Sequence, residues 1–190
     1  MVVAIDGPAG AGKSTVARAV AEALGFTYLD TGAMYRCVAL AGDRDPSTLD
    51  ITFSGGRAFL DGTDVDDDIR TPQIAQEASR RAADPAVRAV LVAKQRELMA
   101  DGDWVAEGRD IATVVAPHAE VKIHLTAAPE ERARRRGLPV EELHERDERD
   151  QGHGRSTLEP AEGATPLDTT GLTLEQVVGR VVALTRKVAA

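Results

Sequence analysis

Residues 7–14 read Gly-Pro-Ala-Gly-Ala-Gly-Lys-Ser and match the phosphate-binding pattern G-x-x-x-x-G-K-[ST] at every fixed position. The glycines allow backbone N–H groups to turn toward an anion, and the lysine supplies a mobile positive charge. The serine hydroxyl can hold Mg²⁺, and the N-terminus of a following helix favours negative charge. The pattern predicts a nucleoside triphosphate site formed by Gly7, Pro8, Ala9, Gly10, Ala11, Gly12, Lys13, Ser14 and Thr15.

The segments on either side of this loop fit the same interpretation. Residues 2–5 form a short apolar run suited to a buried strand, and residues 14–24 are rich in alanine with helical spacing. A glycine-rich turn that joins a strand to a helix without binding phosphate is the alternative. The strand before the loop and the helix after it are the context that favours phosphate binding.

Strand-like and helix-like segments alternate along the chain, which predicts an α/β fold with a parallel sheet. The predicted strands cover residues 2–5, 26–29, 104–106, 121–125 and 164–168. The predicted helices cover residues 14–24, 33–40, 139–150 and 173–188, and others begin near residues 72, 85 and 129. A small hairpin is expected over residues 51–65. We expect one α/β core, residues 1–41, 86–131 and 158–190, with inserted segments at 42–85 and 132–157.

Composition narrows the classes of protein that the chain can belong to. Its 190 residues suit one domain, and the net charge of −8 argues against nucleic acid as a partner. The longest apolar runs are too short to cross a membrane, and we expect no secretion signal. Cys37 is the only cysteine, which excludes an internal disulfide and indicates a cytoplasmic protein. His118, His124 and His144 lack metal-ligand spacing.

A phosphate-binding loop alone does not distinguish a switch, a motor and a kinase. A GTPase switch would need an N-K-x-D motif, and this chain contains no asparagine. No strand that ends in Asp-Glu, as in many motor and remodelling ATPases, is evident. The remaining class is a small kinase, whose inserted segments close over a second substrate and exclude water.

Four separated motifs resemble those of bacterial cytidylate kinases. They are Ile5-Asp6-Gly7-Pro8, Asp30-Thr31-Gly32-Ala33-Met34-Tyr35-Arg36, Gly108-Arg109-Asp110 and Arg146-Asp147-Glu148-Arg149-Asp150. The resemblance covers nearly the whole chain. It implies a P-loop NTPase-type parallel sheet flanked by helices, with a small insert that binds the nucleoside monophosphate (42–85) and a lid (132–157). It also implies transfer of the γ-phosphoryl group of ATP to CMP or dCMP.

The resemblance assigns roles on the ATP side. Lys13 would reach the β- and γ-phosphates, and Ser14 would hold Mg²⁺ with support from Asp30. Arg132 and Arg136 lie four residues apart and would contact adenine and the ATP phosphates. The alternative for Asp30 is an N-cap of the next helix. The alternative for the lid is a solvated helix held by pairs such as Glu142–Arg146.

The resemblance also assigns the residues that would bind CMP. Arg36, Arg109 and Arg146 would contact transferring or acceptor phosphate, and with Lys13 they are the predicted catalytic residues. Asp110 would accept from the cytosine amino group, which a uracil carbonyl cannot replace. The remaining predicted CMP contacts are Thr31, Tyr35, Ser79, Arg88, Asp150 and His153.

His153 is a departure from the family pattern, which normally has arginine at that position. Histidine is a weaker phosphate ligand that is charged mainly below about pH 6.5, and Arg155 is the other candidate. Two rival functions stay open: a small P-loop kinase acting on UMP, AMP or another metabolite, and a nucleotide-dependent interaction module without an acceptor. We expect a monomer whose partners are ATP and CMP or dCMP.

Overall fold

The computed structural model describes residues 1–152 and 159–190, without the side chains of residues 146 and 149–152. The described residues form two compact units, residues 1–28 with 102–190 and residues 29–101. The second unit is wider than the predicted insert, because α2 and α4 pack with the segment between them. The use of residues 42–85 as an insert for substrate stays a prediction.

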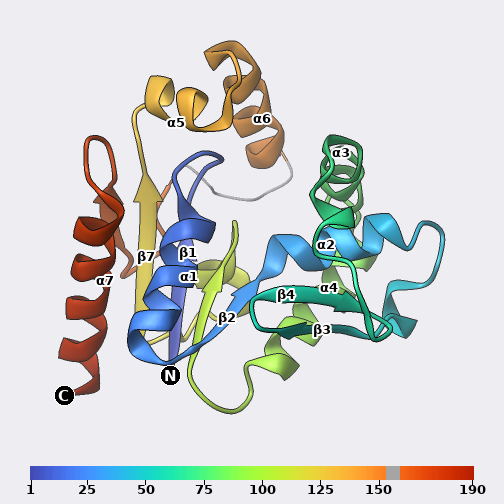
Figure 1. Ribbon diagram of the computed structural model, residues 1–190, viewed down its shortest axis with the longest axis horizontal. Helices are drawn as coiled ribbons and strands as arrows, with labels where there is room; N and C mark the ends of the chain where they lie inside the picture. The colour runs from blue at the N-terminus through green and yellow to red at the C-terminus, as the bar shows by residue number, and fades with distance from the viewer. Residues whose placement is uncertain (153–158) are drawn as a thin grey trace. The chain divides into compact units, whose positions relative to one another are not determined.

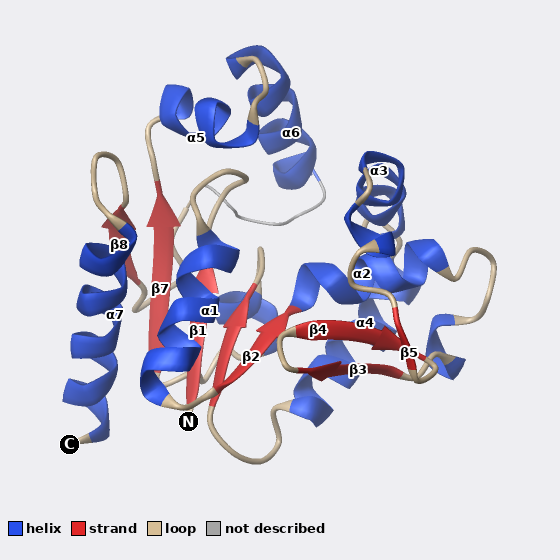
Figure 2. Ribbon diagram, in the orientation of Figure 1, coloured by secondary structure: helices blue, strands red, loops and turns tan. Residues whose placement is uncertain are grey.

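A five-stranded sheet organises the first unit, and β2 carries the chain from it into the second (Figure 1). Its strands are β1 (Val2–Asp6), β2 (Thr27–Asp30), β6 (Trp104–Glu107), β7 (Val121–Thr126) and β8 (Thr165–Asp168). The strand order is β2-β6-β1-β7-β8, and β1 pairs in parallel with both β6 and β7. The predicted parallel α/β fold is confirmed (Figure 2).

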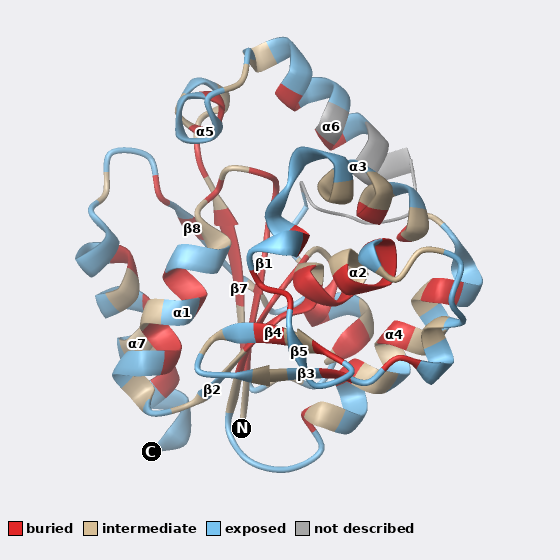
Figure 3. Cartoon of the chain, turned by 45° about the vertical axis from the view of Figure 1, so that its right-hand side comes forward, coloured by how far each residue is buried: buried red, intermediate tan, exposed pale blue. Residues whose placement is uncertain are grey.

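Helices α1 (Lys13–Leu24) and α7 (Leu174–Ala189) pack on one face of this sheet with a shared apolar core. Val3, Ile5 and Ile123 supply the strand side of that core, and Val20 and Val181 supply the helix side. These side chains are almost fully buried. In Figure 3 much of β1 and β7 is drawn in the colour of buried residues. Each one stabilises the fold by about 1.5–3 kcal/mol relative to exposure. This burial stabilises the sheet whose carboxyl edge carries the loop.

Two further helices belong to the first unit, α5 (Pro129–Arg136) and α6 (Val140–Gly152), and they contact each other. A short π-helix, η3 (Ile111–Val115), follows β6. The sequence did not predict η3, because Ile-Ala-Thr-Val-Val has the β-branched composition of a strand. Its first residues are instead hydrogen-bonded to the carboxylate of Asp6.

The second unit combines three helices with a small antiparallel sheet. The helices are α2 (Thr31–Leu40), α3 (Pro72–Arg81) and α4 (Pro85–Leu98), and two 3₁₀ turns, η1 (Pro46–Thr48) and η2 (Asp68–Arg70), lie between α2 and α3 in the chain. Helices α3 and α4 begin where they were predicted, at Pro72 and Pro85, and the side chains of Thr71 and Asp84 cap them. Cys37 lies on α2 and is fully buried, and burial raises the pKa of its thiol to about 11.

The predicted hairpin is present and gains a third strand. Its strands are β3 (Ile51–Ser54), β4 (Arg57–Leu60) and β5 (Thr63–Asp64). Gly55 and Gly56 both have positive φ, which a two-residue hairpin turn of type I′ requires. Asp61 and Gly62 also have positive φ and form a second turn, before β5, that was not predicted.

Candidate active site

The loop between β1 and α1 is shaped by glycines that no other residue could replace. Gly7 has φ 147°, and a Cβ there would lie 2.1 Å from the carbonyl oxygen of Leu125. Gly10 has φ 78°, and its Cβ would lie 2.7 Å from the carbonyl oxygen of Arg132. The backbone of the loop is therefore pressed against β7 and α5. Gly12 caps α1 and has no side-chain acceptor, so no cap side chain competes with an anion for the N-terminus of α1.

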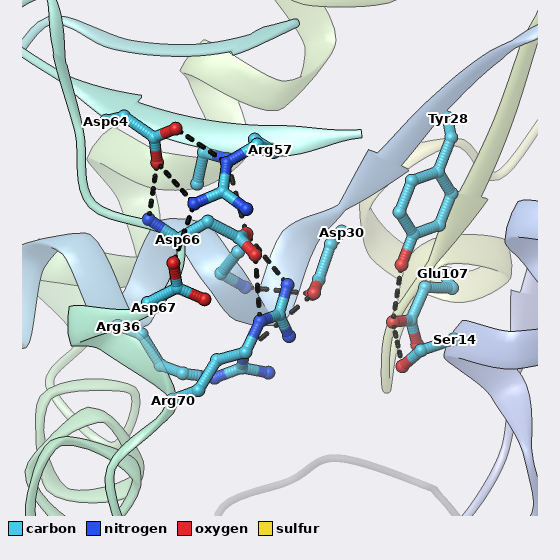
Figure 4. A network of polar contacts seen from close by, with 12 residues as sticks. Ser14, Tyr28, Asp30, Arg36, Arg57, Asp64, Asp66, Asp67, Arg70 and Glu107 are labelled. Atoms are coloured by element: carbon cyan, nitrogen blue, oxygen red, sulfur yellow. Dashed lines mark hydrogen bonds and ion pairs between the residues drawn. The ribbon is translucent and has the colours of Figure 1, made fainter. Parts of the chain in front are cut away.

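The two reactive side chains of the loop have defined contacts. The ammonium of Lys13 donates to the carbonyl oxygen of Pro8 at 3.0 Å. The hydroxyl of Ser14 donates to Oε1 of Glu107 at 2.6 Å, and the hydroxyl of Tyr28 approaches the same oxygen at 3.3 Å (Figure 4). Glu107 is the last residue of β6 and is 5 % exposed. Glu107 was not among the predicted site residues, although a buried strand that ends in a carboxylate beside the Gly108-Arg109-Asp110 motif was a usable signal.

Ser14 and Glu107 form a donor set that suits Mg²⁺. A hydroxyl and a carboxylate oxygen are the hard oxygen ligands that this ion prefers, and P-loop proteins pair such a serine with an acidic residue. Within residues 1–152 and 159–190, no group of three or more His, Cys, Asp or Glu side chains is arranged to hold a metal by itself.

Asp30 has the N-cap role that was the alternative to metal binding. Its Oδ1 accepts from the backbone N–H of Ala33 at 2.9 Å, and its Oδ2 lies 3.9 Å from a guanidinium nitrogen of Arg36. Gly32 makes room for this arrangement, because a Cβ there would lie 3.1 Å from Nη2 of Arg36. Thr31 is buried and Tyr35 is half-buried on α2. Within the second unit, α2 therefore orders Arg36 at its N-terminal turns; the metal role of Asp30 stays a prediction.

Two further predicted contacts belong to other helices of the second unit. Ser79 lies in α3 and Arg88 in α4, and both are half-buried. Thr71 and Asp84 begin these two helices through side-chain acceptors, which fixes where each helix starts. The role of both side chains in base recognition stays a prediction.

Arg109 and Asp110 follow β6 directly and precede η3. Arg109 is half-buried, and Asp110 is 9 % exposed. Asp6, at the end of β1, accepts from the backbone N–H groups of Ile111 at 2.9 Å and Ala112 at 2.7 Å. Burial raises the pKa of Asp6 to about 6, while these two hydrogen bonds act in the opposite direction. The segment that carries Arg109 and Asp110 is thus tied to the strand that leads into the phosphate loop.

Arg132 is buried rather than exposed to solvent. Its guanidinium donates to Oδ2 of Asp147 on α6 at 2.7 Å and to the carbonyl oxygens of Ala9 at 3.2 Å and Ala127 at 3.2 Å. Both side chains of the pair are 6 % exposed. Arg132 thus joins the phosphate loop to α5 and α6. Its contact with ATP stays a prediction, as does that of the exposed Arg136.

A neighbouring arginine that was not predicted also contacts the loop. Arg135 donates to the hydroxyl of Thr169 at 2.8 Å and to the carbonyl oxygen of Ala11 at 3.4 Å. It is also paired with Glu131, whose pKa falls to about 2 beside Arg134 and Arg135. Arginine spacing alone could not separate Arg132, Arg135 and Arg136, because all three lie within two turns of one helix.

Several predicted lid residues fall outside what the structure describes. The backbone of Arg146 and Asp150 belongs to α6, but their side chains are outside the described set. His153 and Arg155 lie outside the described residues altogether. Their predicted roles stay predictions. Of the three histidines that lack metal-ligand spacing, His118 and His144 are exposed, and His124 is buried on β7 in register with Asp6.

The parallel sheet, the glycine-shaped loop and the helix that follows it define a P-loop protein. The same fold occurs in a gluconokinase from Sinorhizobium meliloti, with a TM-score of 0.60, 18% identity and coverage of 99% of this chain and 93% of that one. No helix among the described residues is both long enough and apolar enough to span a membrane.

Comparison of sequences identifies the family more specifically than comparison of folds. The family model for cytidylate kinase matches residues 3–187. A cytidylate kinase from Caldanaerobacter subterraneus is 47% identical over 97% of this chain and 94% of its own length. One from Desulfitobacterium hafniense is 43% identical over 96% and 91%. The chain belongs to the cytidylate kinase family, which confirms the resemblance drawn from the four motifs.

Proposed function

We propose that the protein transfers the γ-phosphoryl group of ATP to CMP and dCMP, giving CDP or dCDP and ADP. The observation that carries this proposal is the loop at residues 7–14 with Lys13, Ser14 and Glu107 around it, in a chain that matches the cytidylate kinase family over residues 3–187. The two relatives described above are both cytidylate kinases. They are 47% and 43% identical to this chain, and the similarity covers nearly their full length.

The ATP side of the reaction rests on the loop and on α1. The N–H groups of the loop and of the first turn of α1 would hold the β- and γ-phosphates. Lys13 would leave the carbonyl oxygen of Pro8, 3.0 Å away, for a phosphate oxygen. Ser14 and Glu107 would hold Mg²⁺, with Asp30 as the other predicted contributor. When bound, that ion neutralises charge on the phosphates and orients them.

The acceptor side rests on arginines and on hydrogen-bonding groups. Arg36 and Arg109 would bind the phosphate of CMP, joined by Arg146 during transfer. A planar guanidinium can donate two hydrogen bonds to one phosphate, which fixes orientation as well as charge. Asp110, with Ser79 and Arg88, would read the donor and acceptor edge of cytosine. Thr31, Tyr35 and Asp150 would complete the site, and His153 or Arg155 would take the remaining lid position.

The chemical step needs alignment rather than a strong base. An oxygen of the CMP phosphate attacks the γ-phosphorus, and the bond from that phosphorus to the β–γ bridging oxygen breaks as ADP leaves. Charge that moves onto the bridging oxygen would be balanced by Lys13 and the arginines. The acceptor phosphate carries about −1.5 to −2 charge at pH 7 and is already nucleophilic. The side chains therefore act by position and by charge.

A coupled assay of ADP release tests this proposal against its rivals. Wild-type protein is supplied with Mg²⁺, ATP and, in parallel, CMP, dCMP, UMP, AMP or shikimate. We expect turnover with CMP and dCMP to exceed that with every other acceptor. Turnover of UMP or AMP as fast as CMP would contradict the proposal. Slow ATP hydrolysis that CMP does not change would indicate an interaction module instead. Gel filtration at assay concentration tests the predicted monomer.

A further inference from the structure

Asp6 is a buried carboxylate to which the proposed reaction assigns no task. It is the last residue of β1, stands next to Gly7 of the phosphate loop and is 5 % exposed. Both of its oxygens are used, Oδ1 by the N–H of Ile111 and Oδ2 by the N–H of Ala112. Burial of an ionised carboxylate costs free energy, which its hydrogen bonds must offset. A carboxylate at this position therefore indicates hydrogen bonds that a neutral side chain could not make equally well.

The two N–H groups are those that η3 itself leaves without acceptors. The first N–H groups of any helix have no partner within the helix and need one from outside. Here the partner comes from a strand 105 residues earlier in the chain rather than from the residue before the helix. Asp110, which occupies the N-cap position, makes no such side-chain bond.

The position of η3 decides where Arg109 and Asp110 lie. The backbone carbonyl of Asp110 accepts from Val114 at 2.8 Å and Val115 at 3.2 Å, so Asp110 is bonded into η3. On the other side, the N–H of Gly108 donates to the carbonyl oxygen of Ile5 at 3.1 Å. The segment from Gly108 to Ala112 is therefore attached to β1 at both ends, by Ile5 and by Asp6. π-helices are rare and often occur at functional sites.

We propose that Asp6 is a positioning residue for the acceptor nucleotide, whose ionised carboxylate holds the N-terminus of η3 and so fixes Asp110 and Arg109 for CMP. This inference rests on the proposed function, because it needs CMP as the acceptor. The ionised form accepts both hydrogen bonds, whereas the protonated form presents an O–H to one of the two N–H groups and loses that bond. An asparagine side chain would likewise present an N–H donor to one of the two N–H groups, and it would do so at every pH.

The charges around Asp6 indicate when the carboxylate is ionised. Burial is the largest influence and raises its pKa to about 6, and Asp110 acts in the same direction. Lys13 and the N–H groups of Ile111 and Ala112 lower it. On the adjacent strands, His124 of β7 is in register with Asp6, and Glu107 of β6 is in register with Ile5. At pH 7.5 the carboxylate is ionised, and near pH 5 it is mostly protonated.

The test compares Asp6→Asn with wild type. At pH 7.5 we expect KM for CMP to rise about tenfold or more, as displaced binding groups commonly cause, while KM for ATP stays within about twofold. The matched control is Glu120→Gln, since Glu120 also accepts a backbone N–H, that of Val2 at 2.8 Å, at the opposite end of β1. A raised KM for CMP in Asp6→Asn alone supports the proposal. An unchanged KM for CMP overturns it.

Thermal unfolding separates positioning from a general loss of structure. Because burial disfavours the ionised form, Asp6→Asn is expected to unfold at pH 7.5 no more readily than wild type. A large drop in Tm with equal losses for ATP and CMP would show a purely structural role and would overturn the proposal. Wild type without CMP phosphorylation would instead refute the proposed function, whatever Asp6→Asn does.

A second measurement uses wild type alone and does not depend on the folding of any variant. Cytidine is the probe, because it lacks the phosphate group that itself titrates near pH 6. Its inhibition constant against CMP is measured from pH 5.2 to pH 7.5. We expect inhibition to weaken on the acid side of about pH 6 as Asp6 gains a proton. An inhibition constant that stays flat over this range would overturn the proposal.

Discussion

Arg132 of α5 donates to the carboxylate of Asp147 on α6 at 2.7 Å, and both side chains are 6 % exposed. The same guanidinium donates to the carbonyl oxygen of Ala9 in the phosphate loop. One residue therefore ties the loop to the two helices that hold the predicted lid residues. Because removal of either partner would leave a buried charge unpaired, this pair is a sensitive point of the first unit.

Asp147→Ala is expected to lower the free energy of unfolding by about 3–5 kcal/mol, because Arg132 would remain buried and charged. The double variant Arg132→Met/Asp147→Leu is expected to regain most of that loss, since apolar replacements of a buried pair are often neutral. Chemical denaturation measures both. Arg44→Ala is the control, because Arg44 and Asp61 are 50 % and 40 % exposed and should matter far less. Equal effects for the buried and exposed pairs would contradict this prediction.

Glu107→Gln is expected to weaken metal binding in the presence of ATP by about tenfold or more, as loss of a supporting carboxylate commonly does. Mn²⁺ binding, followed by electron paramagnetic resonance with and without ATP, measures the effect independently of turnover. Tyr28→Phe is the matched control, because it removes the other partner of the same carboxylate oxygen without changing its charge. Unaltered Mn²⁺ affinity in Glu107→Gln would exclude Glu107 from the metal site.

Asp110→Ala is expected to reduce the preference for CMP over UMP by about 100-fold or more, because a site built on hydrogen bonds discriminates strongly. The measured quantity is the ratio of kcat/KM for the two acceptors. Asp110→Asn is informative beside it, since the amide can turn a donor toward a uracil carbonyl and should favour UMP relative to Asp110→Ala. Binding of ATP should not change. A preserved CMP preference would remove Asp110 from base recognition.

The raised pKa of Asp6 predicts a specific dependence of stability on pH. The folded protein binds this proton with a pKa of about 6, against an ordinary value of 3.8. The stabilising contribution is fully present below about pH 3.8 and is lost as the pH rises through 6, amounting to about 3 kcal/mol. Wild type and Asp6→Asn should therefore differ in unfolding free energy by an amount that changes between pH 4 and 6. Parallel curves for the two proteins over that range would contradict the prediction.

The sequence predicted the features that depend on local spacing. The phosphate loop, the strand before it and the proline-started helices α3, α4 and α5 each follow from residues within one or two turns of each other. The parallel sheet followed from the alternation of strands and helices. The N-cap alternative for Asp30 was also visible locally, because its acceptor oxygen serves a residue only three positions later.

The contacts that the sequence could not supply are long-range. Ser14 and Glu107 are 93 residues apart, and Asp6 and Ile111 are 105 apart. The residues around one member of each pair do not indicate the other member. The two members come together only because β6 lies beside β1 in the sheet. The same reason hid the role of Arg132, whose helix face is shared by other arginines. Only the packing of α5 against the loop and α6 identifies which guanidinium is buried.

Cys37 has a practical consequence for studying the protein. A thiol reacts through its thiolate, and this one is fully enclosed with a pKa of about 11. It is the only cysteine of the chain. Maleimide dyes should therefore leave the folded wild type unlabelled. A single cysteine introduced at an exposed position would accept one fluorophore selectively, so nucleotide-driven movements could be followed by fluorescence without first replacing a native residue.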